Sequence, residues 1–429
     1  ETKNNFLMAV VYTGNNYGIA TVDITTGDFF VTETGSERAL LDEINKFSPS
    51  ELICNEALYM SGLNVEELRD RYQMAVSSLD SRFFSDDVCR KVLSLEGLGL
   101  GDYENGMIAS GCVLQYLYET QKNDLSQLTK LTPYTSGQFM MIDTSTRRNL
   151  ELVETLREKQ KRGSLLWVLD RTRTAMGARM LRSFIEQPLV RKAEIEKRQA
   201  AVEELNMNFI SREEIREYLN SVYDLERLLG RISYKTANPR DLLAFKTSLS
   251  MLPHIKRLLN EFSCDLLKEI HEELDPLEDL YDLVDRAIVE EPPITVREGG
   301  IIKDGYSEEA DQYRKAKTEG KAWLAELESQ EREKTGIRNL KIKFNKVFGY
   351  YFEVTNSFKE LVPDYFIRKQ TLTNAERYTT DRLKELEDVI MGAEDRLYTL
   401  EYELFCGVRD QIAGEVVRIQ GTAKAIAGA

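Results

Sequence analysis

Residues 339–357 read NLKIKFNKVFGYYFEVTNS, and this stretch interrupts a region whose sequence pattern is otherwise helical. Lysines alternate with apolar residues in its opening letters, LKIKF (340–344), which is the two-residue period of a β-strand. A break at Pro363 follows, and residues 366–378 continue with FIRKQTLTNAERY. We therefore predict two β-hairpins, together covering residues 339–380.

The two stretches that flank these hairpins carry apolar residues at alternating steps of three and four, which is typical of a coiled-coil seam. At 1.5 Å per residue, the runs 306–334 and 383–408 each extend roughly 40 Å. We predict two long helices that leave the body of the protein and return to it with a small sheet at their far end. The predicted seam comprises Tyr306, Ala310, Tyr313, Ala316, Gly320, Trp323, Leu327, Leu383, Leu386, Ile390, Ala393, Leu397, Leu400, Leu404 and Val408.

The hairpin region has the opposite charge to the rest of the chain. The sequence contains 72 acidic and 57 basic residues, for a net charge of −15, yet residues 334–384 contain 11 basic and 5 acidic residues. Such a patch attracts anions locally, because salt screens charges beyond about 8–10 Å. The second hairpin adds hydrogen-bonding side chains to its cations, a combination suited to phosphate oxygens. The residues concerned are Arg368, Lys369, Gln370, Thr371, Thr373, Asn374 and Arg377.

Two other interpretations of the second hairpin stay open. Lysines on an edge strand also prevent aggregation, so a solvated edge is an alternative explanation of the charge, although it does not account for the hydrogen-bonding residues clustered at the turn. Thr373 and Glu376 have the spacing of a capping box, which would open a helix and direct backbone N–H groups at an anion. In the hairpin interpretation the turn lies at Thr373-Asn374, because Asn tolerates a positive φ.

The whole chain of 429 residues is too long for one hydrophobic core, and we expect two to four domains. Strand patterns at 6–12, 18–26 and 27–33, followed by alternating helix and strand patterns, predict an α/β domain with a mixed sheet to about residue 124. That segment contains 9 basic and 20 acidic residues and is an unlikely phosphate binder. From 140 to 291 the pattern is helical, and we expect prolines at 188, 239 and 253 to separate helices.

Several functional classes are excluded or disfavoured by the sequence. The longest charge-free apolar stretch, residues 105–118, is too short for a bilayer, which needs about 20 residues. The five cysteines form no CxxC pair, and two histidines leave little for metal or triad chemistry. Residues 97–106, GLGLGDYENG, match no phosphate-binding motif, so we expect a turn there. No Walker A motif occurs, and we expect no catalytic residue and no metal site.

Longer stretches resemble a known family. Residues 141–189, MIDTSTRRNLELVETLREKQKRGSLLWVLDRTRTAMGARMLRSFIEQPL, resemble the start of the core domain of the MutS family of DNA mismatch repair proteins. The stretches 339–354 and 366–378 resemble its clamp. The first domain is similar to its connector, which has an RNase H-like fold. Together these matches account for essentially the whole chain.

The resemblance implies a multidomain protein with α and β structure. The expected parts are an RNase H-like α/β connector at 1–124, a mostly α-helical core with long lever helices at 138–296 and 389–429, and a clamp at 297–388 in which a small antiparallel sheet lies between the lever ends. The mismatch-reading domain, with its Phe-x-Glu wedge, would precede residue 1. The ATPase and dimerisation domain, with its ATP and Mg²⁺, would follow residue 429, so we expect no cofactor and no enzyme activity in this chain.

In the family, two subunits embrace a DNA duplex, and the clamp contacts the DNA backbone without reading its sequence. Carried over by position, this implies double-stranded DNA as a partner, a MutL-type protein at the connector, and a homodimer in the full-length form, in the bacterial cytoplasm with no membrane contact. The implied backbone contacts are Arg368, Lys369, Thr371, Thr373 and Asn374, with Arg377 and Lys346 as weaker candidates. A coiled-coil adaptor that docks proteins and binds no nucleic acid is the alternative function. A connector nuclease using Asp23, Asp28 and Glu33 is disfavoured, because surface carboxylates are common in so acidic a domain.

Overall fold

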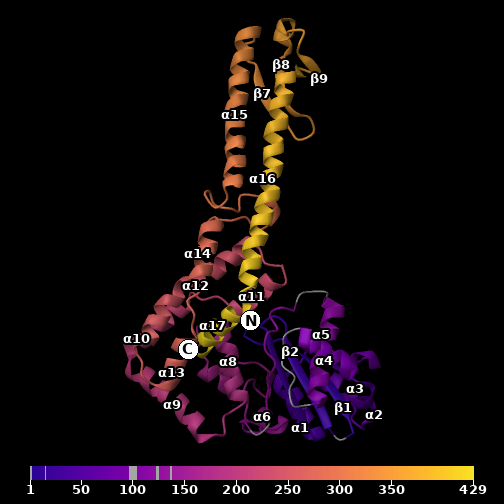
Figure 1. Ribbon diagram of the computed structural model, residues 1–429, viewed down its shortest axis with the longest axis vertical. Coiled ribbons are helices and arrows are strands. Elements are labelled where there is room, and N and C mark those ends of the chain that lie inside the picture. Colours follow the sequence, from indigo (N-terminus) through magenta and orange to yellow (C-terminus); the bar gives the residue numbers. More distant parts are fainter. Residues whose placement is uncertain (1, 15, 96–103, 122–124, 136–137) are drawn as a thin grey trace. The chain divides into compact units, whose positions relative to one another are not determined.

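The computed structural model describes residues 2–14, 16–95, 104–121, 125–135 and 138–429 (Figure 1). The chain forms two compact units. Unit 1 comprises residues 1–237, 241–284 and 409–429, and unit 2 comprises 238–240 and 285–408. The expected boundaries of connector, core and clamp divide the chain differently and stay a prediction.

Unit 1 contains a six-stranded mixed sheet with the strand order β5-β4-β1-β2-β3-β6. The first three strands form an antiparallel meander, whereas β4 and β5 continue from β1 in parallel, and β6 lies parallel to β3. The α/β architecture predicted for this segment is therefore confirmed. The strands are β1 Leu7–Thr13, β2 Asn16–Asp23, β3 Asp28–Thr34, β4 Glu51–Cys54, β5 Ala75–Ser78 and β6 Thr132–Pro133.

Helices cover both faces of this sheet. Met8 and Val10 belong to a core that includes residues of α1, α2 and α3, while Ala9 and Val11 pack with α4 and α5. The fifth helix approaches closely at Gly18, because a Cβ there would overlap its backbone. No described helix is both long and apolar enough to cross a membrane. The helices are α1 Glu37–Phe47, α2 Glu56–Met60, α3 Val65–Tyr72, the 3₁₀-helix η1 Ser81–Phe84, α4 Asp86–Leu95 and α5 Glu104–Gln121.

The GLGLGDYENG motif falls largely outside the described residues. Residues 97–103 are not described, and the remaining three, 104–106, begin α5. The turn predicted for this motif therefore stays a prediction.

The chain from residue 144 onward is mostly helical, as predicted. Pro239 is the first residue of its helix, where its missing N–H costs nothing. The break predicted at Pro253 is wrong, because this proline lies inside the same helix with its ring exposed, between the buried Leu252 and Ile255. Burial of these neighbours offsets the lost hydrogen bond. The helices are α6 Thr144–Asn149, α7 Leu165–Leu169, α8 Ala175–Glu186, α9 Lys192–Met207, α10 Phe209–Leu219, α11 Leu225–Ser233, α12 Pro239–Leu259, α13 Asp265–Glu273, α14 Glu278–Ala287, η3 Val296–Glu298 and α17 Val416–Gly428.

Unit 2 is built on two long helices, α15 Glu308–Thr335 and α16 Asp381–Ala413, which run side by side in Figure 1. Their seam follows most of the predicted pattern. Tyr306 lies before the first residue of α15, and Phe405, which is 1% exposed, is more buried than the predicted Leu404. Trp323 is also wrongly placed in the predicted seam, because it is 37% exposed, whereas its neighbour Leu324 is 8% exposed and packs in the cluster beneath the sheet. The helices pack tightly at Gly320, where a Cβ would overlap the side chain of Ile390.

Between these helices the chain forms a four-stranded antiparallel sheet with the order β7-β8-β10-β9. The two predicted hairpins are confirmed, and their inner strands β8 and β10 pair with each other. The capping-box alternative is wrong, because Thr373 lies in a turn and Glu376 lies in a strand. The elements are β7 Lys341–Asn345, β8 Gly349–Thr355, η4 Asn356–Leu361, β9 Ile367–Thr371 and β10 Ala375–Thr379.

The contact at Gly320 predicts a measurable effect on stability. The substitution Gly320→Ala forces Ile390 off its position and lowers the free energy of unfolding by about 1–3 kcal/mol, the usual cost of overpacking. Thermal and urea unfolding measure the change. The matched control is Gly392→Ala in α16, where a Cβ meets nothing within 4 Å and a gain of up to about 1 kcal/mol is expected from helix propensity. Equal effects of the two substitutions would contradict the packing described.

Candidate nucleic-acid interface

One face of the four-stranded sheet is apolar and packs against the two long helices. Ile342, Phe352, Val354 and Tyr378 lie on this face, because they alternate along their strands and pair across them. They form a cluster with Leu324, Leu327, Leu383, Leu386 and Ile390 of the helices. Phe344, predicted to share this face, is 49% exposed near the end of β7, where its ring lies 5.0 Å from that of Tyr350.

The opposite face, which we call the outward face, is polar and carries cations. Lys343 forms an ion pair with Glu353, and Glu353 also lies across from Arg377 and Lys341 in the strand register. The Arg377 guanidinium lies 4.5 Å from the ring centre of Tyr351. Its Nη1 donates to Oε1 of Gln370 at 2.9 Å. Three cations therefore surround one carboxylate, which leaves the outward face positive.

Lys369 occupies a β-bulge on strand β9. Gln370 pairs with Arg377 and Arg368 pairs with Tyr378, so Lys369 is the extra residue between these two pairs. Its Nζ donates to the carbonyl oxygen of Phe348, in the turn between β7 and β8, at 2.8 Å. A bulge redirects a side chain, and here it brings the lysine of one hairpin to the other.

Arg368 lies on the other side of the bulge from Arg377 and faces a buried carboxylate. Glu376 is 3% exposed, and its Oε1 lies 3.1 Å from Nζ of Lys359 and 3.9 Å from Nη1 of Arg368. The hydroxyl of Tyr378 donates to its Oε2. The hydrogen bond from Tyr378, and then the one from Lys359, lower the pKa of Glu376. Burial and the same carboxylate raise the pKa of Tyr378 to about 12.

The turn between β9 and β10 gathers uncharged polar groups at one end of the sheet. Thr371, Thr373 and Asn374 are exposed there. The backbone N–H of Asn356 donates to the carbonyl of Asn374 at 3.1 Å, and its Nδ2 donates to the carbonyl of Thr373 at 3.0 Å. We call this turn with Asn339, Thr355, Asn356 and Ser357 the polar end. The positive φ predicted for Asn374 is wrong, because the contacts from Asn356 hold the turn in an ordinary conformation.

Lys346 lies at the opposite end of the sheet. It is exposed in the turn between β7 and β8, beside Gly349, whereas Ala375 at the start of β10 pairs with Thr355 at the far end of β8. The seven residues of β8 separate the two ends by roughly 20 Å. This lysine and the polar end therefore cannot bind the same phosphate.

The sequence of the whole chain matches known protein families. Residues 5–129 match the family model described as MutS domain II, and residues 145–429 match that of MutS domain III. The chain belongs to the MutS family. Its MutS relatives include the DNA mismatch repair protein MutS of Lachnoclostridium phytofermentans, 63% identical over all of this chain and 47% of the relative. The proteins of that name from Ruminiclostridium cellulolyticum and Acetivibrio thermocellus are 49% and 47% identical, again over all of this chain and 50% of their own length. The chain thus spans about half the length of these curated relatives.

The structure of this MutS family member separates the seven predicted contact residues into groups. Thr371, Thr373 and Asn374 come together at the polar end, whereas Lys346 lies at the other end. Arg368 and Arg377 lie on opposite faces of the sheet, although they are close in sequence. No prediction included the residues that complete the polar end, Asn339, Thr355, Asn356 and Ser357. The missing information was the pairing of β8 with β10, which the polar residues 355–357 (TNS), at and just after the end of β8, could have suggested.

No metal site was predicted, and the described residues contain no group of three or more His, Cys, Asp or Glu side chains that could hold a metal ion. Asp23 and Asp28, weighed above as nuclease carboxylates, instead bind Asn4, whose Nδ2 donates to both at 2.9 and 3.0 Å. Glu33 accepts from the backbone N–H of Gly106 at 2.9 Å. These carboxylates serve as local hydrogen-bond acceptors.

The buried Glu376 predicts a pH-dependent contribution to stability. Its lowered pKa means that its contribution is present above the pKa of an unfolded Glu and is lost as the pH falls through the folded value. Glu376→Gln should lower the melting temperature by a few degrees at pH 7 and have little effect near pH 3. Differential scanning calorimetry measures both values. Glu360→Gln, on an exposed residue nearby, is the matched control, and an equal shift at both pH values would contradict the ion pairing described.

Proposed function

We propose that this chain acts in DNA mismatch repair and that its four-stranded sheet grips the backbone of double-stranded DNA without reading base sequence. The observation that carries the proposal is the combination of the outward face and the polar end in one sheet. The outward face supplies positive charge, and the polar end supplies exposed hydroxyl and amide groups. Phosphate binding needs both, because charge provides attraction and uncharged donors fix position.

The charge distribution confines the proposed DNA contact to the small sheet. Residues 334–384 have a net charge of +6, while the whole chain has −15. Because screening limits attraction to about 8–10 Å, a duplex is drawn to this sheet and repelled elsewhere. The acidic connector then keeps the rest of the chain from binding DNA nonspecifically.

In the proposed complex, Thr371, Thr373 and Asn374 donate to phosphate or sugar oxygens. Arg377 supplies charge from the outward face and Lys369 from the bulge. Lys346 supplies it from the turn between β7 and β8, and Arg368 from the opposite face of the edge strand β9. Lys369 gives up the carbonyl of Phe348 for a phosphate oxygen, since a hydrogen bond between two ions is stronger than one to a neutral carbonyl. Arg377 is less available for a phosphate, because it already donates a hydrogen bond to Gln370 and packs against the ring of Tyr351.

The two long helices give this sheet a stiff support. Their packed seam, tight at Gly320 and Ile390, lets the pair transmit a displacement along its length. In the whole protein we propose that α15 and α16 couple the sheet to an ATPase domain outside this chain, that two subunits form a homodimer, and that a MutL-type protein binds the connector. This chain alone would hydrolyse no ATP.

Salt dependence tests the proposal directly. Titrating the 429-residue chain into a fluorescent duplex at 50 and 200 mM salt should show a steep loss of affinity, about 100-fold for four neutralised phosphates. Matched and mismatched duplexes should bind alike, since the proposed contacts reach no base. A salt-insensitive signal, or no binding at all, would instead support the alternative of a coiled-coil adaptor that docks proteins.

Two substitutions assign the contact to named residues. Lys369→Glu combined with Asn374→Ala should weaken binding of matched and mismatched duplexes equally and reduce the magnitude of the salt slope by about one. The control is Lys91→Glu, on the exposed surface of α4, which should leave DNA affinity unchanged. A variant pair that alters only the preference for mismatches would show that these residues do not contact the backbone.

A further inference from the structure

The short helix α7 in unit 1 exposes most of its apolar side chains to solvent. Leu166 is buried, whereas the other four residues of the helix are 43–54% exposed. These four are Leu165, Trp167, Val168 and Leu169. Single exposed apolar residues are common on protein surfaces, but a contiguous group of them marks an interaction site. This helix therefore has the character of a contact surface.

A neighbouring segment extends the apolar surface of α7. The backbone N–H groups of Leu165 and Leu166 donate to the carbonyls of Glu151 and Leu152 at 3.0 and 2.9 Å, so residues 150–152 lie against the start of the helix. Leu150, which begins that segment, is 60% exposed. We call the exposed group the α7 patch, and it comprises Leu150, Leu165, Trp167, Val168 and Leu169.

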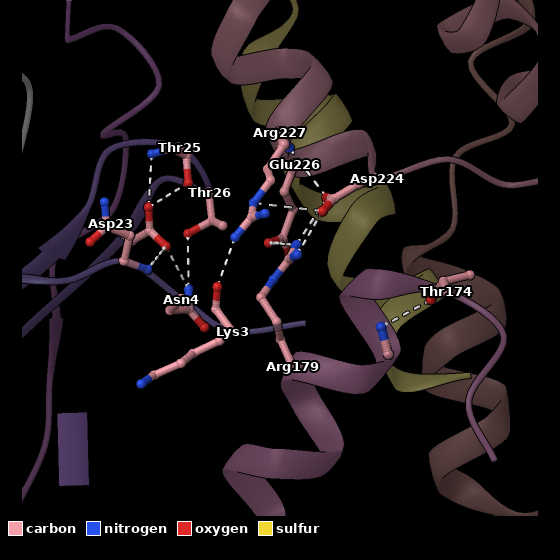
Figure 2. A network of polar contacts seen from close by, with 12 residues as sticks. Lys3, Asn4, Asp23, Thr25, Thr26, Thr174, Arg179, Asp224, Glu226 and Arg227 are labelled. Carbon is pink, nitrogen blue, oxygen red and sulfur yellow. Dashed lines mark hydrogen bonds and ion pairs between the residues drawn. The ribbon is translucent and has the colours of Figure 1, made fainter. Parts of the chain in front are cut away.

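The backbone beneath the α7 patch is firmly anchored. Oγ of Ser164 caps α7 by accepting from the backbone N–H of Trp167 at 3.2 Å. The next helix, α8, packs against α7, and Oγ1 of Thr174 caps it by accepting a backbone N–H of its first turn at 2.9 Å (Figure 2). Figure 2 also shows Arg179 of α8 bound to Asp224 at 2.6 and 2.9 Å, which fixes α8 to the start of α11. A fixed surface loses little conformational entropy when another surface covers it.

Cations surround the α7 patch. Residues 148–173 contain seven basic and four acidic residues, although the whole chain has a net charge of −15. Lys161 pairs with Asp170 at 2.5 Å, whereas the other six cations form no ion pair with the described part of the chain. All six are exposed: Arg148, Arg157, Lys159, Arg162, Arg171 and Arg173. A surface that covers the patch should therefore be apolar at its centre and acidic at its rim.

A second copy of this chain meets these requirements poorly. A twofold contact brings the same patch of two subunits together. The two basic rims would then face each other, and like charges across an interface oppose association.

The remainder of the full-length protein meets the requirements better. This chain covers only 47–50% of the length of the MutS relatives described above. The last helix, α17, packs against α8, as α7 does. A Cβ at Gly428, near the end of α17, would lie 4.0 Å from Sδ of Met180 on α8. Chain that continues beyond residue 429 therefore starts beside the helix that supports α7.

We propose that the part of the full-length protein that follows residue 429 packs on the α7 patch through an apolar surface rimmed by carboxylates. This inference rests on the domain proposed above to lie outside this chain, and it is independent of DNA binding by the four-stranded sheet. Covering the patch removes its apolar side chains from water and gives the surrounding cations acidic partners.

Hydroxyl-radical footprinting read by mass spectrometry tests this cover, because it reports the exposure of individual tryptophans. The chain contains two tryptophans, Trp167 in the α7 patch and Trp323, which is 37% exposed on α15. The oxidation rate of Trp167 should be lower by roughly threefold or more in the full-length protein than in the 429-residue chain, since a covered side chain loses contact with water. The rate at Trp323 should change little. An unchanged rate at Trp167, or an equal fall at both tryptophans, would overturn the proposal.

A concentration series separates this occupant from a second copy. Protection of Trp167 in the 429-residue chain that grows with protein concentration would identify a second copy on the patch and overturn the proposal. The footprint is measured without DNA. A failure of duplex binding in the salt titration would therefore contradict the proposed function of the sheet and leave the footprint result standing.

Two matched variants locate the contact. Val168→Glu places a charge in the α7 patch, and in the full-length protein it should return the oxidation rate of Trp167 to that of the 429-residue chain. The control is Val202→Glu on the exposed surface of α9, which should leave Trp167 protected. Both variants should leave the melting temperature of the 429-residue chain unchanged, because both side chains are exposed there. Continued protection of Trp167 in the Val168→Glu protein would also overturn the proposal.

Discussion

The pairing of β8 with β10 is the contact on which the small sheet depends. A two-stranded hairpin is marginal in water, and the chain contains two of them separated by η4. Their inner strands join through four residue pairs, from Ala375 with Thr355 to Tyr378 with Phe352. This union creates one continuous apolar face for α15 and α16 to cover. It also places the residues after β8 beside the turn before β10, and so builds the polar end from segments that are distant in sequence.

Local patterns in the sequence predicted the elements of this region well. The alternation in residues 340–344 and the three- and four-residue steps of the helical runs each depend on neighbours a few positions away, and the hairpins and the helices both follow them. The predictions failed where burial or helix continuation depended on packing against other elements. Trp323 and Leu324 are adjacent, and only the partner helix determines which one is buried. Pro253 continues a helix because its neighbours are buried, which no local rule contains.

The candidate site also depends on packing that the sequence does not reveal. Composition identified the basic segment and its hydrogen-bonding residues, but not how these residues are distributed over the two faces and the two ends of the four-stranded sheet. One extra residue, Lys369, reverses the side on which its neighbours lie, and a bulge of this kind leaves no mark in the sequence. The carboxylates Glu353 and Glu376 each serve several cations, which also follows only from strand register. A cavity beside α8 is lined by residues from distant parts of the chain, from Lys3 to Ala427, and the sequence did not predict it.

One contact between the sheet and α16 has a mechanical consequence. Oε1 of Glu387 accepts the backbone N–H of Tyr350 at 3.2 Å and fills the space where a side chain on Gly349 would lie. An α-helix turns by about 100° per residue. A rotation of α16 about its own axis would therefore withdraw the Glu387 carboxylate from the turn between β7 and β8 and leave the N–H of Tyr350 without this acceptor.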